Sequence, residues 1–353
     1  MISKNKITII ILCIVLLFIS ACNSSKSGSG VFKVQDIYKG SDGLTITFRQ
    51  DMPSSTIDLV KGTEFDSSPP KKQFIGTTLI GAEIANKGAV KIENGYILVQ
   101  VPNEFSLEND KFESTKESIK KEGKKLITFK LNGKSFELPE GEKEVFSVLA
   151  TATYENLKEK QRGEISFVGC YDYKTIVGAE VCIDKNPDNK KSVKVCDVTK
   201  DISLADQGAP IAVTNIKQIA NKDGEMQFLL KIKNKGDGEV AARNPLGTIV
   251  KDLCSVEPVK EEEFDKIIVT SAKIGSEQAG ADILIGCQPK LVKLEKGEGK
   301  LKCSVSANTF QSTESETFTT ALSVELEYAY KIKVEKSVSI ESLEGYVEEE
   351  KAS

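Results

Sequence analysis

Apolar and polar residues alternate along most of the chain in short stretches, which is the pattern of β-strands with one buried face. The alternation is clear in GLTITFRQ (43–50), GYILVQV (95–101) and GEISFVGCYDY (163–173). A second series begins near residue 210 and ends with TTALSVELEYAYKIKVEKSVSI (319–340). No stretch has the strand–helix–strand spacing of a parallel sheet. The pattern therefore predicts an all-β protein built from antiparallel sheets.

One segment, residues 109–125, carries a helical pattern instead. Phe112, Thr115 and Ile119 are spaced for one face of a helix, and Gly123 is a typical stop. The apolar stripe is thin, so the segment is predicted to be a surface helix or a loop excursion.

Two further local predictions come from turn residues. Asn132-Gly133 lies between two alternating stretches, which favours a type I′ hairpin between ITFKL and KSFEL. The passage 51–72 is polar and contains three prolines, so it is predicted to be irregular, with a short edge strand at 57–60.

The two series of strands have a feature in common. Asn86-Lys87-Gly88 and Asn234-Lys235-Gly236 each follow an amphipathic stretch. This match favours a duplicated domain. We predict a first domain over 32–198, a linker over 199–208, a second domain over 209–347 and a disordered acidic tail over 348–353.

The N-terminus is typical of an export signal. Lys4 and Lys6 precede an apolar run over 7–19, which is short for a membrane span. The four residues Ile19-Ser20-Ala21-Cys22 resemble the lipobox of bacterial and archaeal lipoproteins. The resemblance implies that a signal peptide, 1–21, is removed and that Cys22 carries a lipid, followed by a Ser/Gly tether over 22–31. Conventional cleavage, or a retained single span, are the alternatives.

Several features together resemble a family of surface modules. They are the strand ending in Asn-Lys-Gly, the DMP (51–53) after LTITFRQ, the QGAP (207–210) at the domain junction and the final LEYAYKIKVEK. They are similar to the tandem Ig-like, CARDB-like modules of archaeal cell-surface proteins. The resemblance implies two tandem immunoglobulin-like antiparallel β-sandwiches in an envelope setting, and it implies no catalytic residues.

Eight cysteines divide between the N-terminal segment and the body. Six lie in the body, an even number that predicts disulfides in an exported chain: Cys170, Cys182, Cys196, Cys254, Cys287 and Cys303. Cys287 and Cys303 flank a predicted turn at Gly297, so we pair them. Cys170 and Cys182 flank a similar stretch and form a second predicted pair. Cys196 and Cys254 are left as a third.

Composition limits the chemistry. The chain has no histidine, which excludes Ser-His-Asp and Cys-His catalysis and removes the commonest zinc ligand. The formal net charge is −4, and charges of both signs are interspersed, so no nucleic-acid partner is predicted. No cofactor is predicted either.

Two groups of residues are candidates for binding. The first group is Asp184, Asn186 and Asp188, which alternate along the chain as calcium ligands do. Asn189 stands where the glycine of an EF-hand loop would be. A polar turn is therefore the favoured interpretation. The pairs Tyr171-Tyr173 and Tyr328-Tyr330 each place two rings on one face of a strand. Buried core tyrosines are favoured over a binding surface.

The sequence thus predicts a non-enzymatic protein, lipid-anchored to the cell membrane and outside the cytoplasm. It would act as an adhesion, scaffold or spacer module that contacts other surface proteins or polysaccharide. A ligand-binding lipoprotein of a transporter or sensor system is the alternative.

Overall fold

The computed structural model describes residues 37–64, 71–155, 157, 159–189, 193–222, 224–242, 249–255, 259–275, 283–310 and 315–343. The predicted signal peptide, Cys22, the tether and the acidic tail lie outside the described residues. No helix in the described ranges is long and apolar enough to cross a membrane.

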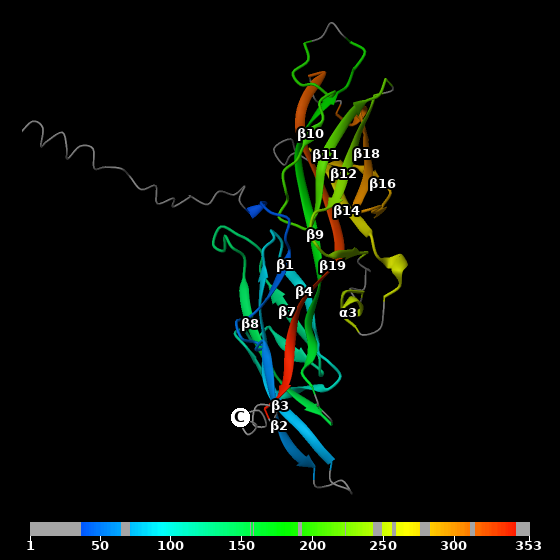
Figure 1. Cartoon of the computed structure of the whole chain (residues 1–353). Coiled ribbons are helices and arrows are strands. Elements are labelled where there is room, and N and C mark those ends of the chain that lie inside the picture. The colour runs from blue at the N-terminus through cyan, green and yellow to red at the C-terminus, as the bar shows by residue number, and fades with distance from the viewer. Residues whose placement is uncertain are drawn as a thin grey trace, which may run out of the picture. The chain divides into compact units, whose positions relative to one another are not determined.

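Strands make up nearly all of the regular structure, which confirms the all-β prediction (Figure 1). The first strands are β1 (Leu44–Phe48), β2 (Thr56–Glu64), β3 (Lys71–Asn86), β4 (Ile92–Gln100), β5 (Phe105–Ser114), β6 (Lys120–Glu122), β7 (Leu126–Leu131), β8 (Lys143–Tyr154) and β9 (Gln161–Asp184). They are followed by β10 (Ile202–Ser203), β11 (Ile211–Ala220), β12 (Glu225–Asn234), β13 (Glu239–Ala241), β14 (Lys266–Ile274), β15 (Ile283–Leu284), β16 (Gly286–Gln288), β17 (Leu291–Lys293), β18 (Glu298–Ser306) and β19 (Thr317–Ser342). The helical elements are short: α3 (Ile249–Leu253), η1 (Glu261–Glu263) and η3 (Ala307–Phe310).

Two long antiparallel strands, β9 and β19, form a ribbon that organises the other strands. Their pairing runs without a register shift from Gln161 opposite Ile340 to Asp184 opposite Thr317. Figure 1 shows β9 and β19 side by side among both groups of strands. We call β1–β8 with the ribbon ends 161–172 and 331–342 lobe 1, and β10–β18 with the rest of the ribbon lobe 2.

Each lobe adds its own strands to this ribbon and covers it with a further layer. In lobe 1, β4 pairs with β9, and β2 pairs in parallel with β19 and antiparallel with β3. In lobe 2, β13 and β14 pair with β19, while β10, β11, β12, β18 and β16 form a separate sheet in that order. Buried side chains of both lobes belong to one continuous apolar cluster.

The helix predicted over 109–125 is wrong. The segment forms the end of β5 and all of β6, and Gly123 takes a positive φ of 68° in the turn before β7. Phe112 pairs with Val148 of β8, and its ring packs against Phe146 with centroids 6.3 Å apart. Pairing with a neighbouring strand buries the apolar residues better than a thin helical stripe could, so tertiary contacts override the local pattern.

The hairpin predicted at Asn132-Gly133 is also wrong. β7 ends at Leu131, and neither residue has the positive φ that a type I′ turn requires. The chain instead runs along another loop, where the Lys134 N–H donates to the Gly88 carbonyl at 2.7 Å. A Cβ at Gly133 would meet the backbone of Ala89 at 2.8 Å, so this glycine serves close backbone contact.

The short strand predicted within 51–72 is present but is longer and differently placed. β2 covers Thr56–Glu64, and it lies between β3 and β19 rather than at a sheet edge. Of the three prolines that suggested irregular chain, Pro53 precedes β2, and Pro69 and Pro70 lie outside the described residues.

All six body cysteines form disulfides, but only one predicted pair is confirmed. Cys287 pairs with Cys303 across β16 and β18. The other two predicted pairs are wrong, because Cys170 bonds Cys254 and Cys182 bonds Cys196. Cys170 and Cys182 lie on the same extended strand, β9, where twelve residue steps span roughly 40 Å, far beyond the reach of a disulfide. Three disulfides indicate an oxidising or extracellular environment.

Candidate functional site

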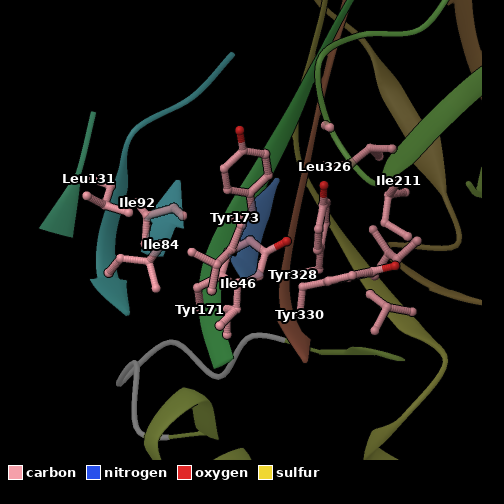
Figure 2. Packing of buried hydrophobic residues seen from close by; sticks show 14 of the residues in the cluster. Ile46, Ile84, Ile92, Leu131, Tyr171, Tyr173, Ile211, Leu326, Tyr328 and Tyr330 are labelled. Carbon is pink, nitrogen blue, oxygen red and sulfur yellow. The ribbon is translucent and has the colours of Figure 1, made fainter. Parts of the chain in front are cut away.

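Four tyrosines meet where the ribbon passes from one lobe to the other. Tyr171 of β9 lies opposite Tyr330 of β19, and Tyr173 lies opposite Tyr328, so all four side chains share one face of the ribbon. Their ring centroids form a four-membered arrangement with neighbours 5.5–6.3 Å apart. Figure 2 shows this tyrosine quartet with Ile46 of lobe 1 and Ile211 of lobe 2 beside it. All four rings are buried, which confirms that they are core residues.

The opposite face of the ribbon is covered at the same place. Val250 and Leu253 of α3 pack against Leu98, Val168 and Ala329. The Cys170–Cys254 disulfide fixes the chain just after α3 to β9. Because both faces of the ribbon are packed, the passage between lobes is part of the protein interior and not an exposed linker.

Two of the tyrosines are held by the repeated Asn-Lys-Gly segments. The Tyr330 hydroxyl donates to Asn234 Oδ1 at 2.9 Å and accepts from the Gly238 N–H at 3.0 Å. The Tyr173 hydroxyl donates to Asn86 Oδ1 at 3.4 Å and accepts from the Val90 N–H at 3.1 Å. These contacts are the same in kind and in sequence spacing.

The asparagines and glycines of the two segments also match. Each asparagine amide donates to the carbonyl four residues on, from Asn86 to Val90 at 2.8 Å and from Asn234 to Gly238 at 2.9 Å. A Cβ at Gly236 would lie 2.5 Å from the Tyr330 hydroxyl, and one at Gly88 would collide with the Tyr173 hydroxyl. The two segments are thus held by the same contacts, while the duplicated domain and its limits, 32–198 and 209–347, remain predictions.

The other two tyrosines differ from each other. The Tyr328 hydroxyl lies 3.0 Å from the Thr175 Oγ1. The Tyr171 hydroxyl is fully buried and has no hydrogen-bond partner among the described residues. The Leu44 N–H is near the Tyr171 hydroxyl but does not meet hydrogen-bond geometry. An unpartnered buried hydroxyl is uncommon and calls for an explanation.

Burial keeps the tyrosines protonated. It raises the pKa of Tyr171 and of Tyr328 well above the usual value, and it raises the pKa of Tyr330 to about 12. Nearby Asp237 and Asp42 add to the shift at Tyr330, against lowering by its hydrogen bonds. At neutral pH the quartet therefore offers neutral hydroxyls that can donate hydrogen bonds.

A cavity of about 230 Å³ lies beside the Tyr171–Tyr330 pair. Its apolar lining includes Leu44, Ile46, Ile332 and Val334, and its polar lining includes Asp42 and Asp237. Both carboxylates are on exposed residues, and within the described chain neither has an ion-pair partner. Lys333 also lines the cavity, but its ammonium group is paired with Glu164 at 3.2 Å and Glu335 at 2.7 Å. The cavity therefore combines apolar walls with two uncompensated negative charges.

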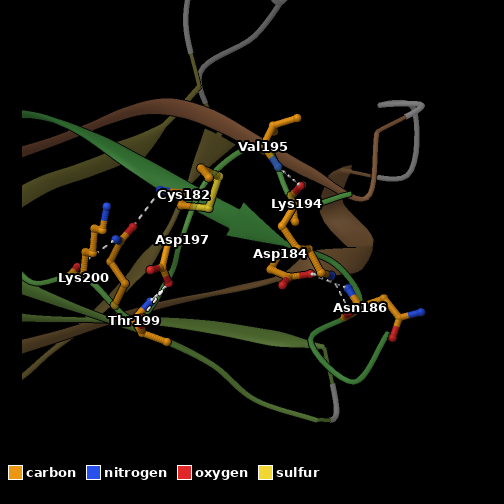
Figure 3. The surroundings of a disulfide bond; sticks show 11 residues. Cys182, Asp184, Asn186, Lys194, Val195, Asp197, Thr199 and Lys200 are labelled. Atoms are coloured by element: carbon orange, nitrogen blue, oxygen red, sulfur yellow. Dashed lines mark hydrogen bonds and ion pairs between the residues drawn. A yellow bond between two sulfur atoms is a disulfide. The ribbon is translucent and has the colours of Figure 1, made fainter. Parts of the chain in front are cut away.

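The calcium candidates are not arranged as a cation site. Asp184 Oδ1 is bound by the Lys194 ammonium at 2.9 Å and by the Asn186 N–H at 3.0 Å (Figure 3). Asp188 is exposed and lies 3.9 Å from Lys222. Within the described ranges, no group of three or more Asp, Glu, Cys or His side chains is placed to hold a metal. The same region contains the Cys182–Cys196 disulfide and the Asp197–Thr199 turn.

Sequence reasoning found the tyrosines but missed the cavity residues Asp42 and Asp237. Both lie in loops next to glycines, where single aspartates are ordinary turn residues. Asp237 follows the second Asn-Lys-Gly segment where Ala89 follows the first, and this difference is the signal in the sequence.

Comparisons with known proteins found similarity at the level of solved structures only. No protein-family model matches it, and no curated protein sequence does. Among solved structures, it is similar to the C-terminal domain of the Streptococcus agalactiae antigen I/II polypeptide BspA, at 9% identity over 84% of this chain and 98% of that one, with a TM-score of 0.19. The C-terminal domain of the Streptococcus pyogenes antigen I/II-family protein AspA gives 8% identity over 85% and 99%, with a TM-score of 0.18. TM-scores this low carry no argument about function.

Proposed function

We propose that the chain is a non-enzymatic, lipid-anchored cell-surface protein that acts as an adhesion, scaffold or spacer module. In this proposal a lipid on Cys22 holds the protein to the membrane. The body is a pair of tandem immunoglobulin-like sandwiches, similar to the CARDB-like modules of archaeal surface proteins. Its function lies in contacts with other surface proteins or polysaccharide.

The observation that carries the proposal is the continuous ribbon of β9 and β19. A spacer must hold its two ends in a fixed relation, and two strands that belong to both lobes do so without a hinge. The tyrosine quartet on one face and α3 on the other exclude water from the passage. The Lys251–Glu122 ion pair, at 2.5 Å, adds a contact from α3 to β6 of lobe 1.

A contact surface is available on the outer face of lobe 1. Val60 of β2 lies opposite Ile75 of β3, and the two side chains are 59% and 41% exposed. Leu79, on the same face of β3, is 43% exposed. Neighbouring exposed apolar side chains on a strand face are typical of protein contact surfaces, so we assign the partner contact to this patch.

The proposal can be tested by crosslinking the full chain in its native envelope and identifying what is captured. We expect a surface protein or polysaccharide, with crosslinks at the Val60–Ile75 patch. Val60→Lys together with Ile75→Lys should abolish the capture. Leu284→Lys is the matched control, because Leu284 is 75% exposed on β15 in lobe 2 and should leave the capture unchanged. Equal capture by the double variant and the control would contradict the assigned surface.

The cavity beside Tyr171 favours a second candidate function, a ligand-binding lipoprotein that serves a transporter or sensor. Its combination of apolar walls and two carboxylates is typical of a small-molecule site. Recovery of a transporter subunit, or of a bound small molecule, in the same crosslinking experiment would favour this function over the first.

A further inference from the structure

The duplicated lobes allow the cavity to be compared with its own counterpart. The Lys87 N–H donates to the Gly43 carbonyl at 2.7 Å, and the Lys235 N–H donates to the Pro210 carbonyl at 2.8 Å. Gly43 and Pro210 are therefore equivalent, as are the residues that precede them, Asp42 and Ala209. The cavity lies where the start of β1 approaches the Asn-Lys-Gly segment of lobe 2, and its counterpart lies where the start of β11 approaches the segment of lobe 1.

The counterpart is closed. There the Ala89 N–H donates to the Gly208 carbonyl at 2.8 Å, and a Cβ at Gly208 would lie 2.8 Å from the Ala89 Cβ. At the cavity the equivalent residues are Asp237 and Ser41, and in the described part of the chain no hydrogen bond joins their backbones. The same architecture is thus packed shut on one side and open on the other.

The residues that differ between the two sides make the open side more negatively charged than the closed side. Ala89 and Ala209 at the closed side are replaced by Asp237 and Asp42 at the open side. Both aspartates line the cavity. Two methyl groups at the closed side thus correspond to two carboxylates at the open side. A cavity that is merely unfilled would not require charged residues.

A third difference concerns the buried hydroxyl. At the closed side, Thr175 lies four residues after Tyr171 on β9 and supplies the partner of the Tyr328 hydroxyl. The equivalent position on β19, four residues after Tyr328, is Ile332, which has no polar group. Tyr171 lines the cavity, and for this reason its buried hydroxyl is left without a hydrogen-bond partner among the described residues.

We propose that the cavity binds a small organic ammonium ion, which rests its alkyl part on Leu44, Ile46 and Ile332 and places its charge by Asp42 and Asp237. The Tyr171 hydroxyl supplies a hydrogen bond to a polar group of the ligand. A bare metal ion fits less well, because calcium and magnesium need several more oxygen ligands than two carboxylates, and the walls here are apolar. This inference rests on the second candidate function and makes no use of the first.

The probe for this inference is 1,4-diaminobutane, whose two ammonium groups and short alkyl chain match the cavity. Isothermal titration calorimetry on the full chain should show saturable binding at millimolar concentrations or below. The neutral analogue 1,4-butanediol should not bind. Asp42→Asn and Asp237→Asn should each weaken diamine binding by about tenfold or more, because each removes a charge-assisted hydrogen bond.

The matched control is Asp188→Asn, an exposed aspartate remote from the cavity that should leave diamine binding unchanged. Asp42 and Asp237 are exposed, so their Asn variants should keep the thermal unfolding midpoint of the parent. Absence of saturable diamine binding, equal binding by the cavity variants, or equal binding of the diol would overturn the inference. A copurified ligand without an amine would overturn it too, while still supporting ligand binding as a function.

Discussion

Tyr171 on β9 lies directly opposite Tyr330 on β19, with their ring centroids 5.9 Å apart. The two residues occupy the same place in the ribbon, but only the Tyr330 hydroxyl is bonded within the described chain. Removing each hydroxyl in turn should therefore have different effects on stability.

Tyr330→Phe should lower the free energy of unfolding by about 1–3 kcal/mol, because it leaves Asn234 Oδ1 and the Gly238 N–H without their partner. Tyr171→Phe should be neutral or stabilising, because it removes a buried hydroxyl that has none. Urea denaturation of both variants checks this. Equal destabilisation by both would show that the Tyr171 hydroxyl is bonded after all.

High pH should destabilise the protein through the same tyrosines. The pKa of Tyr330 is about 12 in the folded protein and near 10 in the unfolded chain. Above pH 10 the unfolded chain therefore binds fewer protons than the folded one, so stability falls as the pH rises from 10 to 12. Ultraviolet absorbance of tyrosinate should show a group of tyrosines that titrate only with unfolding. Titration of all eight tyrosines near pH 10 in the folded protein would refute this.

The disulfide between Cys170 and Cys254 should be the most stabilising of the three, because it closes the longest loop, with a sequence separation of 84. In the chain-entropy model such a loop contributes about 4.5 kcal/mol, against about 3 kcal/mol for the Cys182–Cys196 loop. Paired Cys→Ala variants compared by urea denaturation measure the difference. Non-reducing peptide mapping should first recover the three pairs, and any stoichiometric free thiol would contradict them.

Membrane attachment should depend on one cysteine. Cys22→Ser should release the protein from the membrane fraction, because a thioether-linked lipid needs the thiol. Cys13→Ser, within the predicted signal peptide, is the control and should leave attachment unchanged. Fractionation followed by immunoblotting checks both variants, and a Cys22→Ser protein that stays with the membranes would disprove lipidation at this site.

The strands were predictable from the sequence because a buried face imposes a period of two along the chain. The same pattern could not give the length of β9, since a strand that passes from one lobe to the next looks like two short strands. For this reason the predicted pairing of Cys170 with Cys182 was wrong: the two residues are close in sequence but far apart along one strand. Phe112 suited a helix locally, and only the neighbouring strand β8 made the extended form better.

The candidate site was less predictable than the fold. The tyrosine pairs could be recognised as core residues from their spacing, but their meeting in one quartet depends on the register of two strands that lie far apart in sequence. Asp42 and Asp237 lie far apart in sequence, and only the folded chain brings them to one cavity.

The most direct test of the account is native-state hydrogen exchange across the ribbon. Backbone amides at Tyr171–Tyr173 and Tyr328–Tyr330 should exchange only through global unfolding, together with the cores of both lobes, because the passage is packed on both faces. Fast exchange at these residues while both lobes stay protected would show a flexible hinge, and it would contradict a body that acts as one spacer.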